Sequence, residues 1–92
     1  MAYTVLVERY ALKQILKLDK KIIPEIKAAI ASLAHNPRPN GFKKLKGEDA
    51  YRIRIGDYRI IYEIDDDIIL VTVVSAGHRK KHLSIIKSIH PG

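Results

Sequence analysis

The clearest pattern of apolar and polar positions along the chain lies between residues 50 and 63, where two alternating runs flank a Gly56-Asp57 pair. Strict alternation predicts β-strands, because successive side chains of a strand point to opposite faces. A Gly-Asp pair between two such runs predicts a two-residue hairpin loop. We therefore expect the fold to be organised around this hairpin.

The register of the predicted hairpin brings basic side chains together. With a two-residue loop, Arg54 lies opposite Arg59, and Arg52 lies on the same face, opposite Ile61. Like charges directly opposite each other destabilise a strand pair by roughly 0.2–1 kcal/mol. We therefore expect an anionic partner at this face. The competing interpretation is a basic sheet face that is simply solvated.

Two amphipathic helices are predicted before the hairpin. Residues 3–7 are rich in β-forming types and predict a first strand. Apolar residues then recur every three or four positions over 8–18, and again from a start within 19–23 to about residue 34. Pro24 fits only near the start of the second helix, where a missing amide hydrogen costs little. The apolar positions of the two helices are Ala11, Leu12, Ile15, Leu16 and Leu18, then Ile22, Ile26, Ala29, Ile30 and Leu33.

The remaining elements are predicted around the hairpin and after it. Residues 42–47 alternate weakly and predict a short strand, and the acidic run 65–67 predicts a tight turn. Residues 68–74 are apolar at both parities, so they predict a central strand buried on two faces and ended by Ala-Gly at 76–77. Residues 78–89 have a weak helical pattern.

This order of elements predicts an α+β fold. A helical hairpin is expected to pack on one face of an antiparallel sheet, in a single domain spanning residues 1–92. A short helix or tail follows at the C-terminus. The natural inner side chains of the hairpin are Ile53, Ile55, Tyr58, Ile60 and Tyr62. The opposite face, with the three arginines, is expected to be the open one.

Composition adds a partner class to this picture. The chain has 17 Lys and Arg against 10 Asp and Glu, a formal net charge of +7, which is typical of a protein that binds a polyanion. Charge alone leaves nucleic acid and an acidic protein open. The absence of cysteine excludes disulfides and thiolate chemistry. With no apolar run long enough for a membrane and no signal-peptide pattern, we expect a cytoplasmic protein.

Three sequence blocks resemble a known family. These blocks are Lys44–Gly47, Tyr51–Tyr62 and Ala76–Lys80, and together they are similar to the RelE branch of the RelE/ParE toxin superfamily. The resemblance implies a RelE-like fold and an endoribonuclease that cuts messenger RNA in the ribosomal A site without a metal or other cofactor. It also implies a RelB-like antitoxin partner, in a 1:1 or 2:2 complex.

The resemblance also implies site residues. The catalytic set falls on Arg52, Arg54, Arg59 and Arg79, with His82 as the neighbour that stands in for an aromatic residue missing near Leu83. The basic residues expected to bind RNA are Lys43, Lys44, Lys46, Lys80 and Lys81. The expected antitoxin contacts are Leu83, Ile86 and Ile89.

Each catalytic role follows from the chemistry of metal-free RNA cleavage. The reaction needs a base for the 2′-hydroxyl, positive charge for the phosphorane and a proton for the leaving 5′-oxygen. Guanidinium groups suit the second task, so we expect Arg54, Arg59 and Arg79 to clamp the phosphate, with Arg79 polarising the leaving oxygen. Arg52 would orient the 2′-hydroxyl, since a guanidinium stays protonated near neutral pH and is a poor base. The best-known family members carry a lysine at this position.

Two other functions remain compatible with these residues. A ParE-like protein of similar fold would inhibit DNA gyrase, and a catalytically weakened toxin would act only by binding its antitoxin. Cut message, a DNA-damage response or no effect on growth would distinguish the three.

Overall fold

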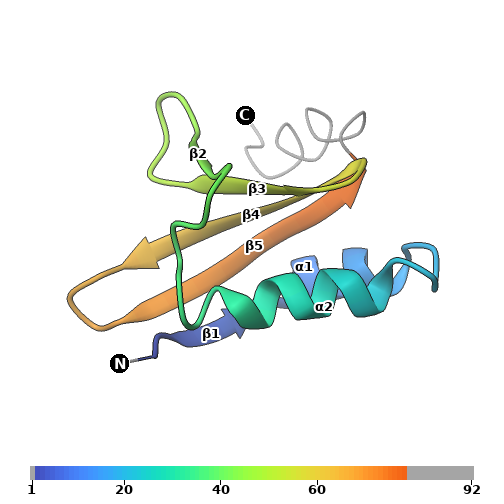
Figure 1. The fold of residues 1–92 in the computed structure, drawn as a ribbon, viewed down its shortest axis with the longest axis horizontal. Coiled ribbons are helices and arrows are strands. Elements are labelled where there is room, and N and C mark those ends of the chain that lie inside the picture. The colour runs from blue at the N-terminus through green and yellow to red at the C-terminus, as the bar shows by residue number, and fades with distance from the viewer. Residues whose placement is uncertain (1, 79–92) are drawn as a thin grey trace.

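The computed structural model describes residues 2–78, which form one sheet with two helices on one of its sides (Figure 1). The elements are β1 (Thr4–Val7), α1 (Arg9–Leu16), α2 (Ile23–Ser32), β2 (Lys43–Lys44), β3 (Tyr51–Ile55), β4 (Tyr58–Asp65) and β5 (Leu70–His78). The strand order is β1-β5-β4-β3-β2, with β1 parallel to β5 and the other neighbours antiparallel. The predicted α+β fold is confirmed.

The predicted hairpin is formed by β3 and β4 with the expected register. Arg54 pairs with Arg59, and Arg52 pairs with Ile61. Gly56 has a φ of +58°, a backbone conformation that costs glycine little, so the tight loop is possible at this position. The local sequence of the hairpin therefore places Arg52, Arg54 and Arg59 on one face of the sheet.

Both helices pack their apolar stripes on the same sheet face. The residues buried between helices and sheet include Ala11, Ile15, Ile26, Ile30 and Leu33 from the helical region and Ile53, Ile60, Tyr62, Val71, Val73 and Ala76 from the strands. Two apolar positions of the first predicted helix, Leu12 and Leu16, lie outside this core, with side chains that are 45% and 62% exposed. They follow Ala11 and Ile15 directly, so they point about 100° around α1 from the side that faces β5. Within residues 2–78, no helix is long and apolar enough to cross a membrane.

The last described strand differs from its prediction at both ends. The Asp65 carboxylate accepts hydrogen bonds from the backbone amides of Asp67 (3.0 Å) and Ile68 (3.3 Å), which turns the chain there. Ile68 is therefore 62% exposed in a turn, and β5 begins at Leu70. β5 also continues through residues 76–77 to His78, so the Ala-Gly pair does not end it. Beyond His78, the expected C-terminal helix or tail lies outside the described residues.

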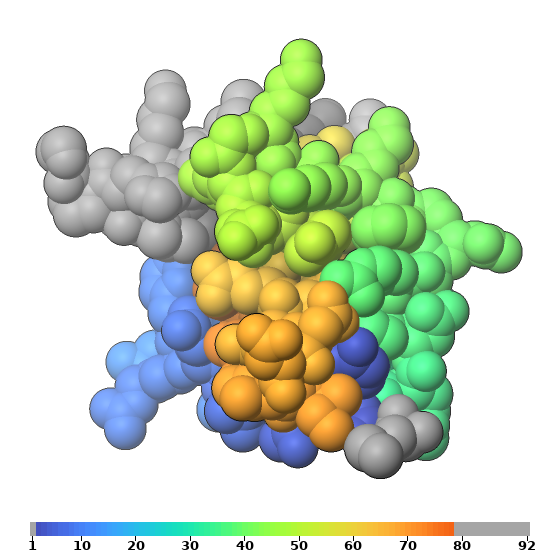
Figure 2. All heavy atoms as spheres, turned by 90° about the vertical axis from the view of Figure 1, so that its left-hand side faces the viewer, coloured from blue at the N-terminus to red at the C-terminus, as the bar shows by residue number. Residues whose placement is uncertain are grey.

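A cluster of hydrogen bonds among Tyr3, Arg38 and Asp66, called the latch below, joins three segments that are distant in sequence. Arg38 donates from both terminal nitrogens to the Asp66 carboxylate, at 2.8 and 3.3 Å, and the Tyr3 hydroxyl donates to the same group at 2.7 Å. The buried Tyr62 hydroxyl donates to the Pro37 carbonyl oxygen at 2.7 Å. Figure 2 shows the β4–β5 turn (orange) beside the N-terminal strand (dark blue). The latch thereby holds the segment that leads into β2.

Replacing Asp66 with asparagine is expected to lower Tm near pH 7, and the difference from wild type is expected to close in acid. Hydrogen bonds from Arg38 and then from Tyr3 hold the pKa of Asp66 below its usual value. A carboxyl whose pKa is lower in the folded state stabilises the fold above the unfolded-state pKa, and this contribution is lost as pH falls through the folded-state pKa. Circular dichroism melts from about pH 7 to about pH 2.5 measure the effect. Asp57→Asn, at the exposed hairpin tip, is the control and should show no such closing difference.

Candidate functional site

The candidate site is the arginine face, formed by Arg52, Arg54 and Arg59 on the side of the sheet opposite the helices. Arg52 and Arg54 are two residues apart on β3, so they share a face, and the hairpin register sets Arg59 of β4 beside Arg54. The sequence predicted this grouping, and the structure confirms that the three side chains come together.

Burial differs among the three arginines. Arg54 is exposed and Arg59 is partly exposed, but Arg52 is only 7% exposed. The expectation of an open face is therefore wrong for Arg52. Its neighbours in the same cross-strand row are Ile61 of β4, which is 4% exposed, and Lys43 of β2.

Within the described part of the chain, the three arginines of this face form no ion pair. Burial, and then the charges of Arg59 and Arg54, lower the pKa of Arg52. The Arg59 Nε is buried and has no hydrogen-bond acceptor among residues 2–78. A buried donor without a partner costs roughly 1–3 kcal/mol, a cost that an anionic acceptor at this face would offset.

Two small residues of β5 lie in the same cross-strand rows as the arginines. Ser75 pairs with Ile61 in the row of Arg52, and Gly77 pairs with Arg59 in the row of Arg54. The sequence analysis ended the strand at residues 76–77 and so did not place Gly77 in the sheet beside Arg59. The sequence signal for this placement was Ser75 and Gly77, two residues apart and directly after a long β-forming run.

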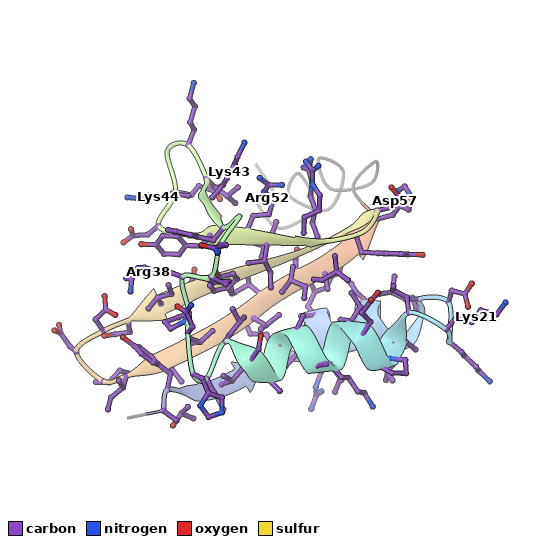
Figure 3. The ribbon with its side chains drawn as sticks, in the orientation of Figure 1. Lys21, Arg38, Lys43, Lys44, Arg52 and Asp57 are labelled. Atoms are coloured by element: carbon purple, nitrogen blue, oxygen red, sulfur yellow. The ribbon has the colours of Figure 1, made fainter. Side chains whose placement is uncertain are left out.

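The three predicted RNA-binding lysines of the β2 region do not act as one group. Lys43 pairs with Arg52 in the sheet, and Figure 3 shows both side chains on the side away from the helices. Lys44 has the opposite parity, and its Nζ lies 3.9 Å from Asp49. Lys46 is exposed in the segment between β2 and β3. Only Lys43 therefore joins the arginine face.

The other predicted site residues lie outside the described residues. They are Arg79, Lys80, Lys81, His82, Leu83, Ile86 and Ile89. In the described part of the chain, no three His, Asp or Glu side chains are grouped so that they could hold a metal ion. What the described face offers a ligand is guanidinium and ammonium donors, which match phosphate oxygens.

Comparisons with known proteins agree on one family. The family described as "ParE toxin of type II toxin-antitoxin system, parDE" matches residues 5–83. The mRNA interferase toxin RelE of Escherichia coli K12 is 31% identical over 84 residues, covering 88% of this chain and 87% of the relative. The putative toxin RelE1 of Methanocaldococcus jannaschii is 35% identical over 81 residues, covering 82% and 90%. One chain of the crystal structure of the toxin-antitoxin complex RelBE2 from Mycobacterium tuberculosis superposes with a TM-score of 0.77 at 28% identity, covering 86% of this chain and all of that one.

Proposed function

Because the chain belongs to the RelE/ParE family of toxins from type II toxin-antitoxin systems, we propose that it is a ribosome-dependent, metal-independent endoribonuclease that cleaves mRNA in the ribosomal A site. The observation that carries this proposal is the arginine face, with its buried Arg52 and the unpartnered Nε of Arg59. A relative named as an mRNA interferase supports the same reaction class.

The proposed reaction cleaves the RNA chain by transesterification within one nucleotide, in which the 2′-oxygen attacks the adjacent phosphate. The 2′-oxygen forms a bond to phosphorus, and the bond from phosphorus to the 5′-oxygen breaks. The 2′ proton passes to a base, and the leaving 5′-oxygen takes up a proton, which gives a 2′,3′-cyclic phosphate and a 5′-hydroxyl. Arg54 and Arg59 hold the non-bridging oxygens, whose negative charge grows in the transition state. Arg52 orients the 2′-hydroxyl, since its guanidinium stays protonated near neutral pH. Arg79 is proposed to polarise the leaving oxygen and His82 to carry a proton, on the basis of the sequence.

We propose a RelB-like antitoxin as the protein partner. The similar chain from Mycobacterium tuberculosis is part of a toxin-antitoxin complex. Here α1 exposes Leu12 and Leu16, one helical turn apart, on a chain of net charge +7, which suits an acidic amphipathic segment. The sequence-based contacts at Leu83, Ile86 and Ile89 belong to the same proposal, for a complex of 1:1 or 2:2 stoichiometry.

The test of the proposed function uses ribosomes programmed with a defined message and an empty A site. Purified protein is added, and message ends are mapped by primer extension. We expect cuts at fixed positions within the A-site codon, absent when the antitoxin is present. Intact message with inhibited gyrase supercoiling would favour the ParE-like alternative. The description of the matching family names a ParE toxin, which is consistent with that alternative. Intact message with active gyrase would favour the third alternative, a weakened toxin that acts only by binding its antitoxin.

A further inference from the structure

A cavity of about 430 Å³ opens at the outer edge of β3, next to the arginine face. Its lining includes Ala29 of α2, Asn40 and Gly41 of the segment before β2, and Lys43, Arg52 and Arg54. Two of the three arginines therefore belong to both the face and the cavity. The volume lies within the range of pockets that hold small ligands, about 300–1,000 Å³.

The cavity exists because β2 is short. β2 pairs only with Tyr51 and Arg52, so within residues 2–78 no strand covers the outer edge of β3 from Ile53 to Ile55. The chain approaches β2 through Gly41, which lines the cavity and has a φ of +88°, a conformation that costs glycine little. The latch between Arg38 and Asp66 fixes the start of the same segment. The opening is thus built by the fold and does not depend on one side-chain rotamer.

The walls of the cavity are of two kinds. One wall is apolar and carries Ala29 with Ile53 and Ile55, which lie on the helix side of β3. The other is cationic and carries Lys43 with Arg52 and Arg54. Arg52 is 7% exposed and has no carboxylate partner among the described residues, so a bound anion would be only weakly screened by water. An apolar wall beside a cationic one suits a nucleobase joined to a phosphate.

We propose that this cavity binds the nucleotide next to the scissile phosphate, with its base against Ala29 and its own phosphate beside Lys43. The inference rests on the proposed RNA cleavage, because it assumes that the scissile phosphate lies between Arg54 and Arg59. It makes the β3 edge a determinant of base preference. An extended peptide could instead pair with the free edge of β3, but three cations in the lining favour a polyanion.

The test measures base preference on ribosomes carrying a library of A-site codons, with cut frequencies read by sequencing. Ala29→Phe narrows the cavity, and Ala28→Phe is its matched control because Ala28 is exposed one position earlier on α2. We expect Ala29→Phe to change relative cleavage between codons by about tenfold or more, as loss of a fitted pocket does. Ala28→Phe should keep the wild-type profile.

A second pair keeps the test independent of any folding defect. Lys43→Ala removes an exposed side chain, and we expect it to lower cleavage about tenfold at every codon and to reduce the salt dependence of RNA binding. Lys27→Ala, which removes an equal charge from the exposed face of α2, should stay within about twofold.

The outcomes separate the two proposals. If wild-type protein cuts and both Ala29→Phe and Lys43→Ala behave like their controls, the nucleotide site is wrong and the proposed nuclease stands. If these variants cut normally but bind antitoxin more than about tenfold more weakly, the edge is a peptide site and the inference is also wrong. If wild-type protein cuts no message, both proposals fall together.

Discussion

Replacing Arg59 with methionine is expected to lower message cleavage by about 10³-fold while raising the melting temperature. A single arginine that contacts a transferring phosphoryl group is worth about 10³-fold or more in rate. Methionine keeps an apolar chain of similar reach but holds no charge, so the loss reports the guanidinium.

The gain in stability follows from the same geometry. Arg59 faces Arg54 across the hairpin, and its buried Nε has no acceptor in the described structure. Replacing an unsatisfied buried polar group with an apolar one removes its desolvation cost, here about 1 kcal/mol, and 1 kcal/mol raises Tm by about 4–8 °C in a domain of this size. Opposite changes in activity and stability are typical of a group retained for its ligand.

Single-turnover cleavage on programmed ribosomes and thermal melts together measure this prediction. The control is Arg9→Met, an equal substitution at an exposed position of α1, which should change both quantities little. Full cleavage by Arg59→Met would remove this residue from the proposed site. A lower Tm would show that the guanidinium stabilises the free protein after all.

The hairpin could be predicted from the sequence because its register depends on neighbours in the chain. Gly56 and Asp57 define the loop, and parity then assigns each side chain to a face. Nothing from a distant segment can shift this register without turning the arginines into the core. The grouping of Arg52, Arg54 and Arg59 is therefore a local property of 14 consecutive residues, 50–63.

The burial of Arg52 could not be predicted in this way. Arg52 shares its cross-strand row with Lys43, from another segment, and with Ile61, and the alternation of the hairpin does not tell how exposed such a row is. The predicted start of β5 was wrong for a related reason. The prediction used the apolar character of Ile68 and did not consider the hydrogen bonds that the Asp65 side chain can accept. Asp65 instead bonds the turn amides and leaves Ile68 in solvent.

The cavity beside β3 was beyond sequence reasoning altogether. It joins Ala29 of α2 to Asn40 and Lys43, which only the packing of the helix against the sheet brings together. Spacing along the chain contains no information about such an opening. The part of the site that specifies the ligand is therefore the part that depends on tertiary structure.

Replacing Arg52 with lysine is expected to increase cleavage about tenfold or more at mildly alkaline pH and to introduce a new pH dependence. Burial, followed by the charges of Arg59 and Arg54, lowers the pKa of a cation at this position. A guanidinium starts above about 12, so it stays protonated regardless. A lysine amine starts near 10.4 and shifts readily when it is buried, so the same surroundings would bring it toward neutrality and allow it to accept the 2′ proton.

The charged groups around position 52 make the sign of this effect definite. Lys43 faces it from β2, Arg54 lies on the same strand and Arg59 lies on β4, and all three are cations that disfavour a further positive charge. Cleavage by Arg52→Lys should therefore rise with pH up to the lowered pKa of the new amine and then level off, because only the neutral amine is a base. Wild-type cleavage should lack this step.

Arg54→Lys is the matched comparison, on the same strand and face but at an exposed position. It should gain no activity, because an ammonium group does not replace the forked phosphate contact proposed for Arg54. Rate profiles from about pH 6 to about pH 9 on programmed ribosomes measure both variants. If Arg52→Lys cleaves more slowly than wild type with an unchanged profile, position 52 acts only as a forked phosphate ligand, for which lysine is a poor substitute. If it gains activity, the site already contains the surroundings that a general base requires, and the native arginine leaves the wild-type protein without that base at position 52.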